Sequence, residues 1–180
     1  MHRINNNYVR DVEHKYLPEF VYGGIDGSVT TFAVVAGVIG ASLSSAVILI
    51  LGFANLMGDG FSMAASNYLS TKSRNDLVKG KDKINPNKTA LATFLAFLLI
   101  GLIPLLSFVA AAITGNPYLE KNKFIFSIIL TFVAFGIIGW FKGEITGKSK
   151  TYSSIQTISI GAVTSVLAYA TGYFIKTLLG

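Results

Sequence analysis

Five long apolar stretches constrain the fold of this chain more than any other feature of its sequence. They run over residues 18–42, 46–70, 88–114, 123–141 and 155–179. Each is close to the roughly 20 residues with which a helix crosses about 30 Å of hydrocarbon. Segments inside a bilayer must satisfy their own backbone hydrogen bonds, and the chain lacks the alternating pattern of a membrane β-barrel. The sequence therefore predicts an all-α, polytopic membrane protein with five transmembrane helices.

The composition of the 180-residue chain agrees with this interpretation. Hydrophobic residues make up 52% of the chain and charged residues only 13%, whereas soluble domains carry about 25% charged residues. The chain has no cysteine, which excludes disulfides and thiolate metal sites. The first twenty residues are polar and lack the apolar centre of a cleavable signal peptide. A net charge of +6 would suggest nucleic acid as a partner of a soluble protein, but here its distribution indicates membrane orientation instead.

Lys and Arg are unequally divided between the two sides that five spans create. One side carries twelve: Arg3, Arg10, Lys15, Lys72, Arg74, Lys79, Lys81, Lys83, Lys88, Lys142, Lys148 and Lys150. The other side carries three: Lys121, Lys123 and Lys176. Since cytoplasmic loops are enriched in these residues, we predict a cytoplasmic N-terminus. Residues 1–17 then form a cytoplasmic amphipathic segment, and residues 18–180 form the transmembrane domain.

Two aspartates, Asp26 and Asp59, lie inside the first and second apolar stretches. An ionised carboxylate in hydrocarbon costs from roughly 2.5 to more than 10 kcal/mol, depending on the scale. A chain that carries two of them is expected to use them, most simply to bind a cation or a proton during transport.

The second stretch places four polar or polarisable side chains in one column. Asn55, Asp59, Met63 and Asn67 recur every four residues, and residues four apart stack along one helix face. The alternative is that these residues hold helices together by hydrogen bonds. For Asn55 and Asn67 the two interpretations stand even, whereas a carboxylate such as Asp59 is a costly way to join helices.

In the first stretch, Gly23 and Gly27 flank Asp26 at the spacing of a close-packing motif. They allow a partner helix or an ion to approach the carboxylate, and Thr30, one turn further on, is placed to donate a hydrogen bond to it. At 1.5 Å per residue, Asp26 lies about 12 Å from the inner end of its span, Asp59 about 16 Å and Met63 about 10 Å. The sequence therefore predicts that these three side chains converge on one ion.

The ligand types indicate which ion this would be. Carboxylates suit any hard divalent cation, whereas the thioether of Met63 favours a softer one. Fe²⁺ or Mn²⁺ is therefore preferred over Mg²⁺ or Ca²⁺, with Co²⁺, Ni²⁺ and Zn²⁺ as alternatives. For Met63 alone, packing is the alternative. Burial and a second carboxylate both disfavour the charged form of Asp26 and Asp59. An empty site would therefore hold a proton that a divalent cation displaces, which is the basis of metal–proton exchange.

The remaining spans carry no acidic residue or histidine in their cores, and Pro104 predicts a kink in the third. The chain contains no phosphate-binding loop and no nucleophile–base pair. We therefore expect no enzymatic activity and no resident cofactor, the metal being the transported substrate.

Two segments that contain these polar residues form a recognisable combination of motifs. They read YGGIDGSVTTFAVVAGVIGA in the first span and GFANLMGDGFSMAASNYLSTKS in the second. Together they resemble the vacuolar iron transporter family, and a weaker likeness continues at GLIPLLSF, IIGWFKGEITG and LAYATGYFI. The likeness covers nearly the whole membrane part of the chain.

The resemblance implies a five-helix protomer that forms a homodimer, with an ion path at the dimer interface lined by the first two helices of both subunits. It also implies proton-coupled export of Fe²⁺, and often Mn²⁺, from the cytosol to a vacuole or the cell exterior. The family's aspartate on the first helix corresponds to Asp26, and its Ser-Met methionine on the second helix corresponds to Met63.

This chain departs from the family pattern in two places. Many members carry a long acidic insertion after the second helix, whereas the corresponding loop here, KSRNDLVKGKDKINPNK, is short and basic. Many members also have a glutamate after the Ser-Met motif, where this chain has Asn67. Asp59 is then the residue that can supply the missing charge within the membrane.

The hypothesis that follows is a dimeric exporter of Fe²⁺ or Mn²⁺ in the inner (plasma) membrane, which exchanges metal for protons. Its predicted metal-site residues are Asp26, Asp59, Met63, Asn55 and Asn67. Three alternatives remain. The chain could transport another cation or a small metabolite, or it could be a membrane scaffold that transports nothing. A small membrane enzyme is disfavoured, and no nucleic-acid partner is expected.

Overall fold

The structure, a computed structural model, describes residues 6–77 and 83–180, and for residues 6–15 the backbone alone. The described part is entirely helical. Its elements are α1 (Asn6–Gly40), α2 (Ser45–Leu77), α3 (Pro86–Gly101), the 3₁₀ turn η1 (Ile103–Leu105), α4 (Leu106–Thr114), α5 (Pro117–Thr146) and α6 (Lys150–Leu179). Because α3, η1 and α4 follow one another as a single span, five segments are long and apolar enough to cross a membrane. The predicted all-α fold with five transmembrane helices is confirmed.

The helices extend further than the apolar stretches that predicted them. The second span was expected at residues 46–70, and α2 continues to Leu77; the fourth was expected at 123–141, and α5 runs over Pro117–Thr146. Backbone hydrogen bonding does not stop where the sequence turns polar, so these helices project beyond the hydrocarbon. The predicted N-terminal helix is the first part of α1, which runs unbroken from Asn6 past Pro18. Residues 1–5 lie outside the described residues, and the division of the chain at residue 17, like the cytoplasmic N-terminus, stays a prediction.

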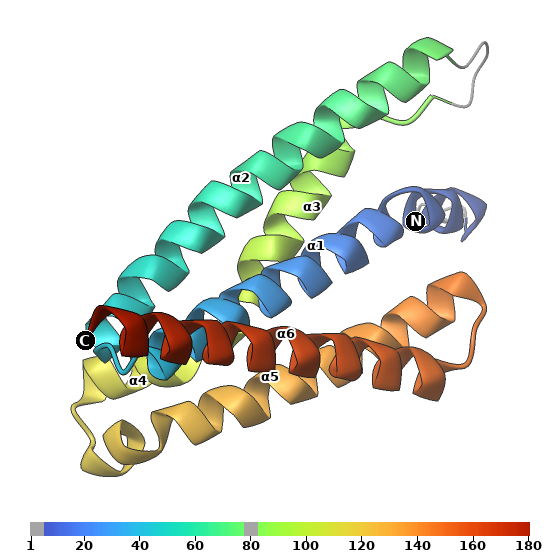
Figure 1. Ribbon diagram of the computed structural model, residues 1–180. Coiled ribbons are helices and arrows are strands. Elements are labelled where there is room, and N and C mark those ends of the chain that lie inside the picture. The colour runs from blue at the N-terminus through green and yellow to red at the C-terminus, as the bar shows by residue number, and fades with distance from the viewer. Residues whose placement is uncertain (1–5, 78–82) are drawn as a thin grey trace.

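Helix α1 occupies the centre of the bundle. In Figure 1 it runs between α2 and α3 on one side and the α5–α6 pair on the other, and it contacts all four. The core where these helices meet includes Phe32 and Val35 of α1, Leu56 of α2, Phe97 of α3 and Leu105 of η1. This central position means that α1 presents different faces to different neighbours.

The contact between α1 and α3 depends on the two glycines that flank Asp26. A Cβ atom at Gly23 would lie 2.5 Å from the carbonyl oxygen of Thr93, and one at Gly27 would lie 2.5 Å from that of Phe97. Both distances are shorter than any side chain tolerates, so the close-packing motif predicted from the sequence operates here. The helix that packs against these two glycines is α3. The side chain of Asp26, which lies between them in the sequence, is turned away from α3.

Glycines also bring α6 against the C-terminal half of α1. In the predicted orientation this is the outer half, and the ends of the helices are called inner and outer in that sense. A Cβ atom at Gly37 would meet the backbone of Ala168, and Gly40 faces the backbone of Tyr169 in the same way. In Figure 1 the two helices lie together at this end and diverge toward the start of α6. The inner half of α1 is therefore not held by α6.

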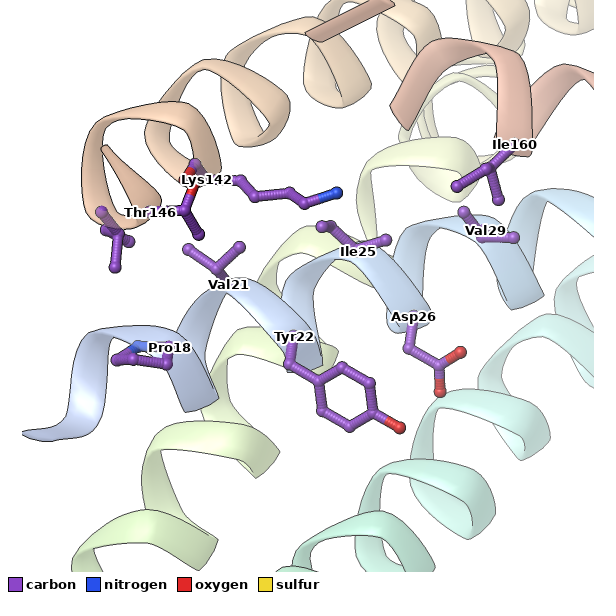
Figure 2. Close-up of a pocket in the computed structure, with 10 residues that line it drawn as sticks. Pro18, Val21, Tyr22, Ile25, Asp26, Val29, Lys142, Thr146 and Ile160 are labelled. Carbon is purple, nitrogen blue, oxygen red and sulfur yellow. Dashed lines mark hydrogen bonds between the residues drawn. The ribbon is translucent and has the colours of Figure 1, made fainter. Parts of the chain in front are cut away.

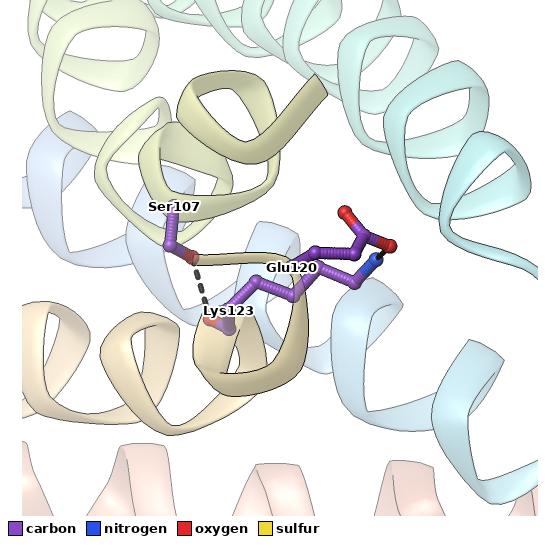
Figure 3. Close-up of polar contacts among 3 residues, drawn as sticks. All are labelled: Ser107, Glu120 and Lys123. Atoms are coloured by element: carbon purple, nitrogen blue, oxygen red, sulfur yellow. Dashed lines mark hydrogen bonds and ion pairs between the residues drawn. The ribbon is translucent and has the colours of Figure 1, made fainter. Parts of the chain in front are cut away.

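The kink predicted at Pro104 is confirmed as a 3₁₀ turn that separates α3 from α4. The Ser127 hydroxyl donates to the carbonyl oxygen of Pro104 at 2.6 Å, and the Ser107 hydroxyl donates to that of Lys123 at 2.7 Å. Figure 3 shows the second of these bonds beside the ion pair between Lys123 and Glu120. Two serines thus fasten α5 to the interrupted third span and satisfy carbonyl groups there.

Candidate functional site

Polar side chains of α1 and α2 contact each other near both ends of the helix pair. Toward the outer end, the Asn55 amide donates to the hydroxyls of Thr30 and Thr31, each at 3.4 Å. Toward the inner end, the Asn67 amide donates to the Glu19 carboxylate at 2.6 Å. The two asparagines predicted as part of the site therefore both join α2 to α1.

Asn67 lies at the centre of a hydrogen-bonded cluster that connects three helices. Besides Glu19 of α1, its amide donates to the Thr93 hydroxyl of α3 at 2.6 Å, and its oxygen accepts from Thr71 at 3.1 Å. The Thr71 hydroxyl is in turn 3.2 Å from that of Thr89. Both amide hydrogens of Asn67 are used in this way, so its role here is to position Glu19.

The sequence analysis did not identify Glu19 as a site residue, because it fell at the edge of the polar N-terminal segment. The seven-residue spacing between Glu19 and Asp26 could have identified it. Residues seven apart lie on nearly the same face of a helix, so the face of α1 that carries Asp26 also carries Glu19. Helix α1 therefore carries a second carboxylate, that of Glu19, on the same face as Asp26 and toward the inner end.

The two end contacts set the register of the antiparallel helices. With Glu19 beside Asn67 and Thr30 beside Asn55, Asp26 lies at the level of Asp59, and Met63 lies one turn toward the inner end. The sequence predicted Asp26 at a level between Asp59 and Met63, and this register brings it nearer to Asp59 than predicted.

Asp26 and Asp59 differ in how far the rest of the chain covers them. Asp26 is half-buried, whereas Asp59 is exposed on the side of α2 that also carries the exposed residues Ser62 and Ser66. The buried residues of α2 recur every four positions on the opposite face. Among the described atoms, none lies within 4 Å of a Cβ position at Gly58. A single chain therefore leaves one side of the aspartate pair open.

The remaining predicted contacts are only partly as expected. Met63 is half-buried and packs against the core cluster, so it contributes to helix packing in this structure. The prediction that Thr30 donates to the Asp26 side chain is wrong: its hydroxyl donates to the backbone carbonyl of Asp26 at 2.8 Å. Threonine in a helix readily bonds the carbonyl four residues earlier, and that partner is closer than the carboxylate.

Within the residues that the structure describes, no three histidine, cysteine, aspartate or glutamate side chains converge as a metal-binding group. One chain offers two carboxylates at the level of Asp26 and a third at Glu19. In Figure 2 the Asp26 side chain points to the opposite side of α1 from Lys142, together with Tyr22. The carboxylate therefore belongs to the α1–α2 side of the helix.

Comparison with known proteins gives matches over nearly the whole chain. The model of the VIT family matches residues 17–84 and 78–173. The two matches meet in the connection between α2 and α3, where the sequence predicted a shortened loop. Similar proteins include a vacuolar iron transporter of Toxoplasma gondii, which is 24% identical over 229 residues, covering 92% of this chain and 76% of the relative.

Two plant proteins show how relatives of different length align. Vacuolar iron transporter 1 of Tulipa gesneriana is 27% identical over 234 residues, covering 94% of this chain and 87% of the relative. Vacuolar iron transporter homolog 4 of Arabidopsis thaliana is 28% identical over 185 residues, covering 89% of this chain and 90% of the relative. The first alignment is much longer than this 180-residue chain and so contains insertions in the relative. The second is close to the length of this chain and so contains fewer insertions.

Proposed function

Because this chain belongs to the VIT family, we propose that it is a multi-pass membrane transporter of divalent transition metals, with its ion path along the polar face between α1 and α2. The observation that carries the proposal is the register that places Asp26 level with Asp59, two carboxylates within a membrane-spanning pair of helices. Relatives of this chain are named iron transporters, which makes Fe²⁺ the first substrate to test and Mn²⁺ the second. A transporter needs no catalytic group, in agreement with the sequence.

In the proposed site, Asp26 and Asp59 bind the metal, and Met63 biases the site toward softer cations. Carboxylate oxygens bind any divalent metal, whereas the thioether discriminates against Mg²⁺ and Ca²⁺. Asn55 and Asn67 shape the path by joining the helices above and below the aspartates. Glu19, held by Asn67, extends the path toward the inner end.

The site is proposed to be completed by a second copy of the chain. A carboxylate that faced lipid at the depth of Asp59 would cost at least about 2.5 kcal/mol, and the exposed side of α2 carries that carboxylate together with Ser62 and Ser66. A two-fold axis along this face would cover Asp59 and bring two aspartates from each copy together. Such a homodimer has four carboxylates at this level, whereas one chain has two.

Proton exchange follows from the same charges. Four carboxylates near one another in a poorly solvated site cannot all stay ionised, because burial and like charges both disfavour the anion. The empty site then holds protons, and a divalent metal displaces them. We propose export from the cytosol across the inner (plasma) membrane; the names of the relatives make a vacuolar membrane the other location to examine.

The test is transport by purified protein in proteoliposomes, read with a metal-sensitive dye and a pH-sensitive dye. Asp26→Asn and Asp59→Asn should each lower Fe²⁺ and Mn²⁺ flux about 10–100-fold, the factor expected when one charged ligand worth about 1.5–3 kcal/mol is removed. Proton movement should fall in parallel. Asp76→Asn is the matched control, because Asp76 is exposed near the inner end of α2 and lies outside the proposed path.

Unchanged metal flux in the two aspartate variants would overturn the site. Flux of a monovalent cation or a metabolite in place of metal would favour the transport of another substrate. A wild-type protein that assembles normally yet moves no metal would favour a scaffold.

A further inference from the structure

A cavity of about 450 Å³ lies between α1 and the α5–α6 pair, and its lining includes Tyr22 and Asp26 of α1. Figure 2 shows Val21, Ile25 and Val29 of α1 facing Lys142 of α5 and Ile160 of α6 across it. Its walls are mostly aliphatic, and its volume falls in the range of roughly 300–1,000 Å³ that is common for ligand pockets. The cavity exists because α6 approaches α1 at the outer end and diverges from it at the inner end.

The position of the cavity along the helices places it in one leaflet. It is bounded by the first half of the α1 span, by the last turns of α5 near Thr146, and by the early part of α6. This is the same end of the bundle as the α5–α6 turn and the α2–α3 connection. It is therefore the end where the lysines and arginines of the sequence are concentrated.

Lys142 places a positive charge at this cavity. Its ammonium group donates to the amide oxygen of Gln156 at 3.0 Å and, having three donors, keeps two for another partner. The nearby Glu144 is paired with Lys150. Among the residues that the structure describes, Lys142 forms no ion pair. The cavity thus combines a mostly aliphatic wall with the Lys142 ammonium group at the inner end of the bundle, and the side chain of Asp26, which also lines it, points away from that group (Figure 2).

We propose that this cavity binds a phospholipid with an anionic headgroup, in the leaflet that contains the inner ends of the helices. An acyl chain would lie against Val21, Ile25 and Val29, and the phosphate would accept hydrogen bonds from Lys142. Basic pockets between transmembrane helices on the cytoplasmic side are known to favour such headgroups. A free phosphate or polar metabolite would leave the aliphatic wall in contact with water, so the lipid is the better fit. The proposal does not require metal transport, although Asp26 belongs to the proposed metal site and also lines this cavity.

The test is native mass spectrometry of the detergent-purified protein, with phosphatidylglycerol and phosphatidylcholine of identical acyl chains as probes. The wild-type protein should retain phosphatidylglycerol several-fold more than phosphatidylcholine. Lys142→Gln should remove this preference while leaving chain binding in place. Ile160→Trp, which fills the cavity from an exposed position on α6, should abolish retention of both lipids.

Two controls separate the cavity from the general surface. Lys148→Gln removes an exposed lysine at the same end, and Ile155→Trp adds the same bulk at an exposed residue of α6 outside the cavity. Both should behave as the wild type. Equal loss of preference in Lys142→Gln and Lys148→Gln would overturn the proposal, as would unchanged lipid retention in Ile160→Trp. A change of oligomeric state in Ile160→Trp without loss of lipid would show that a protein segment occupies the cavity, and would overturn it too.

Discussion

The α1–α2 pair and the α5–α6 pair use most of their buried polar groups in different ways, although Lys142 and Ser154 also donate hydrogen bonds across α5 and α6. In α5 and α6, the buried hydroxyls of Thr131 and Thr157 donate to carbonyl oxygens four residues earlier in their own helices. In α1 and α2, Asn55 and Asn67 instead bond across to the neighbouring helix. Hydroxyls that are satisfied within one helix add little specificity, whereas amides and carboxylates that need a partner fix how two helices face each other.

The backbone contacts differ less. Helix α5 meets α6 through Gly139, whose Cβ position would lie 2.5 Å from the Cα atom of Ser154, just as Gly27 of α1 meets α3. Close packing through glycine is thus common to both halves of the molecule and does not mark a functional site. The difference lies in what the glycines flank: in α1 they flank a carboxylate, and in α5 they flank aliphatic and aromatic residues.

The largest effect expected is that of Gly27→Ala, which tests whether the carboxylate-bearing helix is held as tightly as the comparison implies. The added methyl group would lie 2.5 Å from the carbonyl oxygen and 2.9 Å from the Cα atom of Phe97. Because backbone cannot rotate away, we expect a loss of about 3 kcal/mol, the upper part of the usual range for overpacking. The free energy of unfolding in mixed micelles, titrated with dodecyl sulfate, measures it.

Gly136→Ala is the matched control for this substitution. Its nearest neighbour would be the Cδ1 atom of Ile158 at 3.9 Å, an ordinary contact, so the exchange should leave stability unchanged or raise it by up to about 1 kcal/mol through helix propensity. Equal effects at the two glycines would show that α1 and α3 can separate freely, which would contradict the packing described.

The next effect in size is that of Asn67→Leu, which removes the cross-helix bonds at the inner end. Glu19 and Thr93 would lose their donor, and leaving such groups unsatisfied costs about 1–3 kcal/mol. Thr157→Val in α6 is the control, because that hydroxyl only bonds its own helix; it should cost about 1 kcal/mol or less. The same dodecyl sulfate titration compares them. A smaller loss for Asn67→Leu than for Thr157→Val would reverse the distinction between the two helix pairs.

Much of this arrangement could be predicted from sequence because it follows from local patterns. Apolar length predicted five spans, Pro104 predicted the break between α3 and α4, and the four-residue spacing placed Asn55, Asp59 and Asn67 in one column. Helix rise alone placed Asp26 at a depth between those of Asp59 and Met63. Each of these depends on one helix at a time or on the level at which a helix ends.

What could not be predicted depends on which helix faces which. The glycines beside Asp26 predicted a close contact, but only the fold identifies α3 as the partner. Glu19 was missed because its importance depends on a contact with Asn67 from a distant part of the chain. The Thr30 hydroxyl was assigned to a carboxylate, although the helix itself supplied a nearer acceptor. Helix rotation, which sequence spacing leaves undetermined, accounts for the first two, whereas the third is a local competition between acceptors within α1.

A smaller effect is expected for Asn55→Ala, and it sharpens the assignment of that residue. Its two bonds to threonine hydroxyls are 3.4 Å long, near the limit of a hydrogen bond, so their loss should cost about 0.5–1 kcal/mol. If Asn55 only joins the helices, metal flux in proteoliposomes should stay close to that of the wild type. A drop of about tenfold or more, equivalent to about 1.4 kcal/mol, would instead make Asn55 a metal ligand.

The smallest effect is expected at the outer end of α5, where an ion pair lies away from the contact between α1 and α2. Glu120 pairs with Lys123 within one helix, and its side chain is 58% exposed (Figure 3). Exposed pairs of this kind contribute about 0–1 kcal/mol, and salt screens them. Glu120→Gln should therefore change the unfolding free energy by no more than about 0.5 kcal/mol, and the difference should vanish at high ionic strength.

Since Ser107 is bonded to the backbone oxygen of Lys123 and not to its side chain, the α4–α5 junction keeps this hydrogen bond in the Glu120→Gln variant. A larger, salt-independent loss would mean that the ion pair orders this junction. A charged pair at the end of α5 would then also hold helices together, and the distinction drawn between the α1–α2 and α5–α6 pairs would fail.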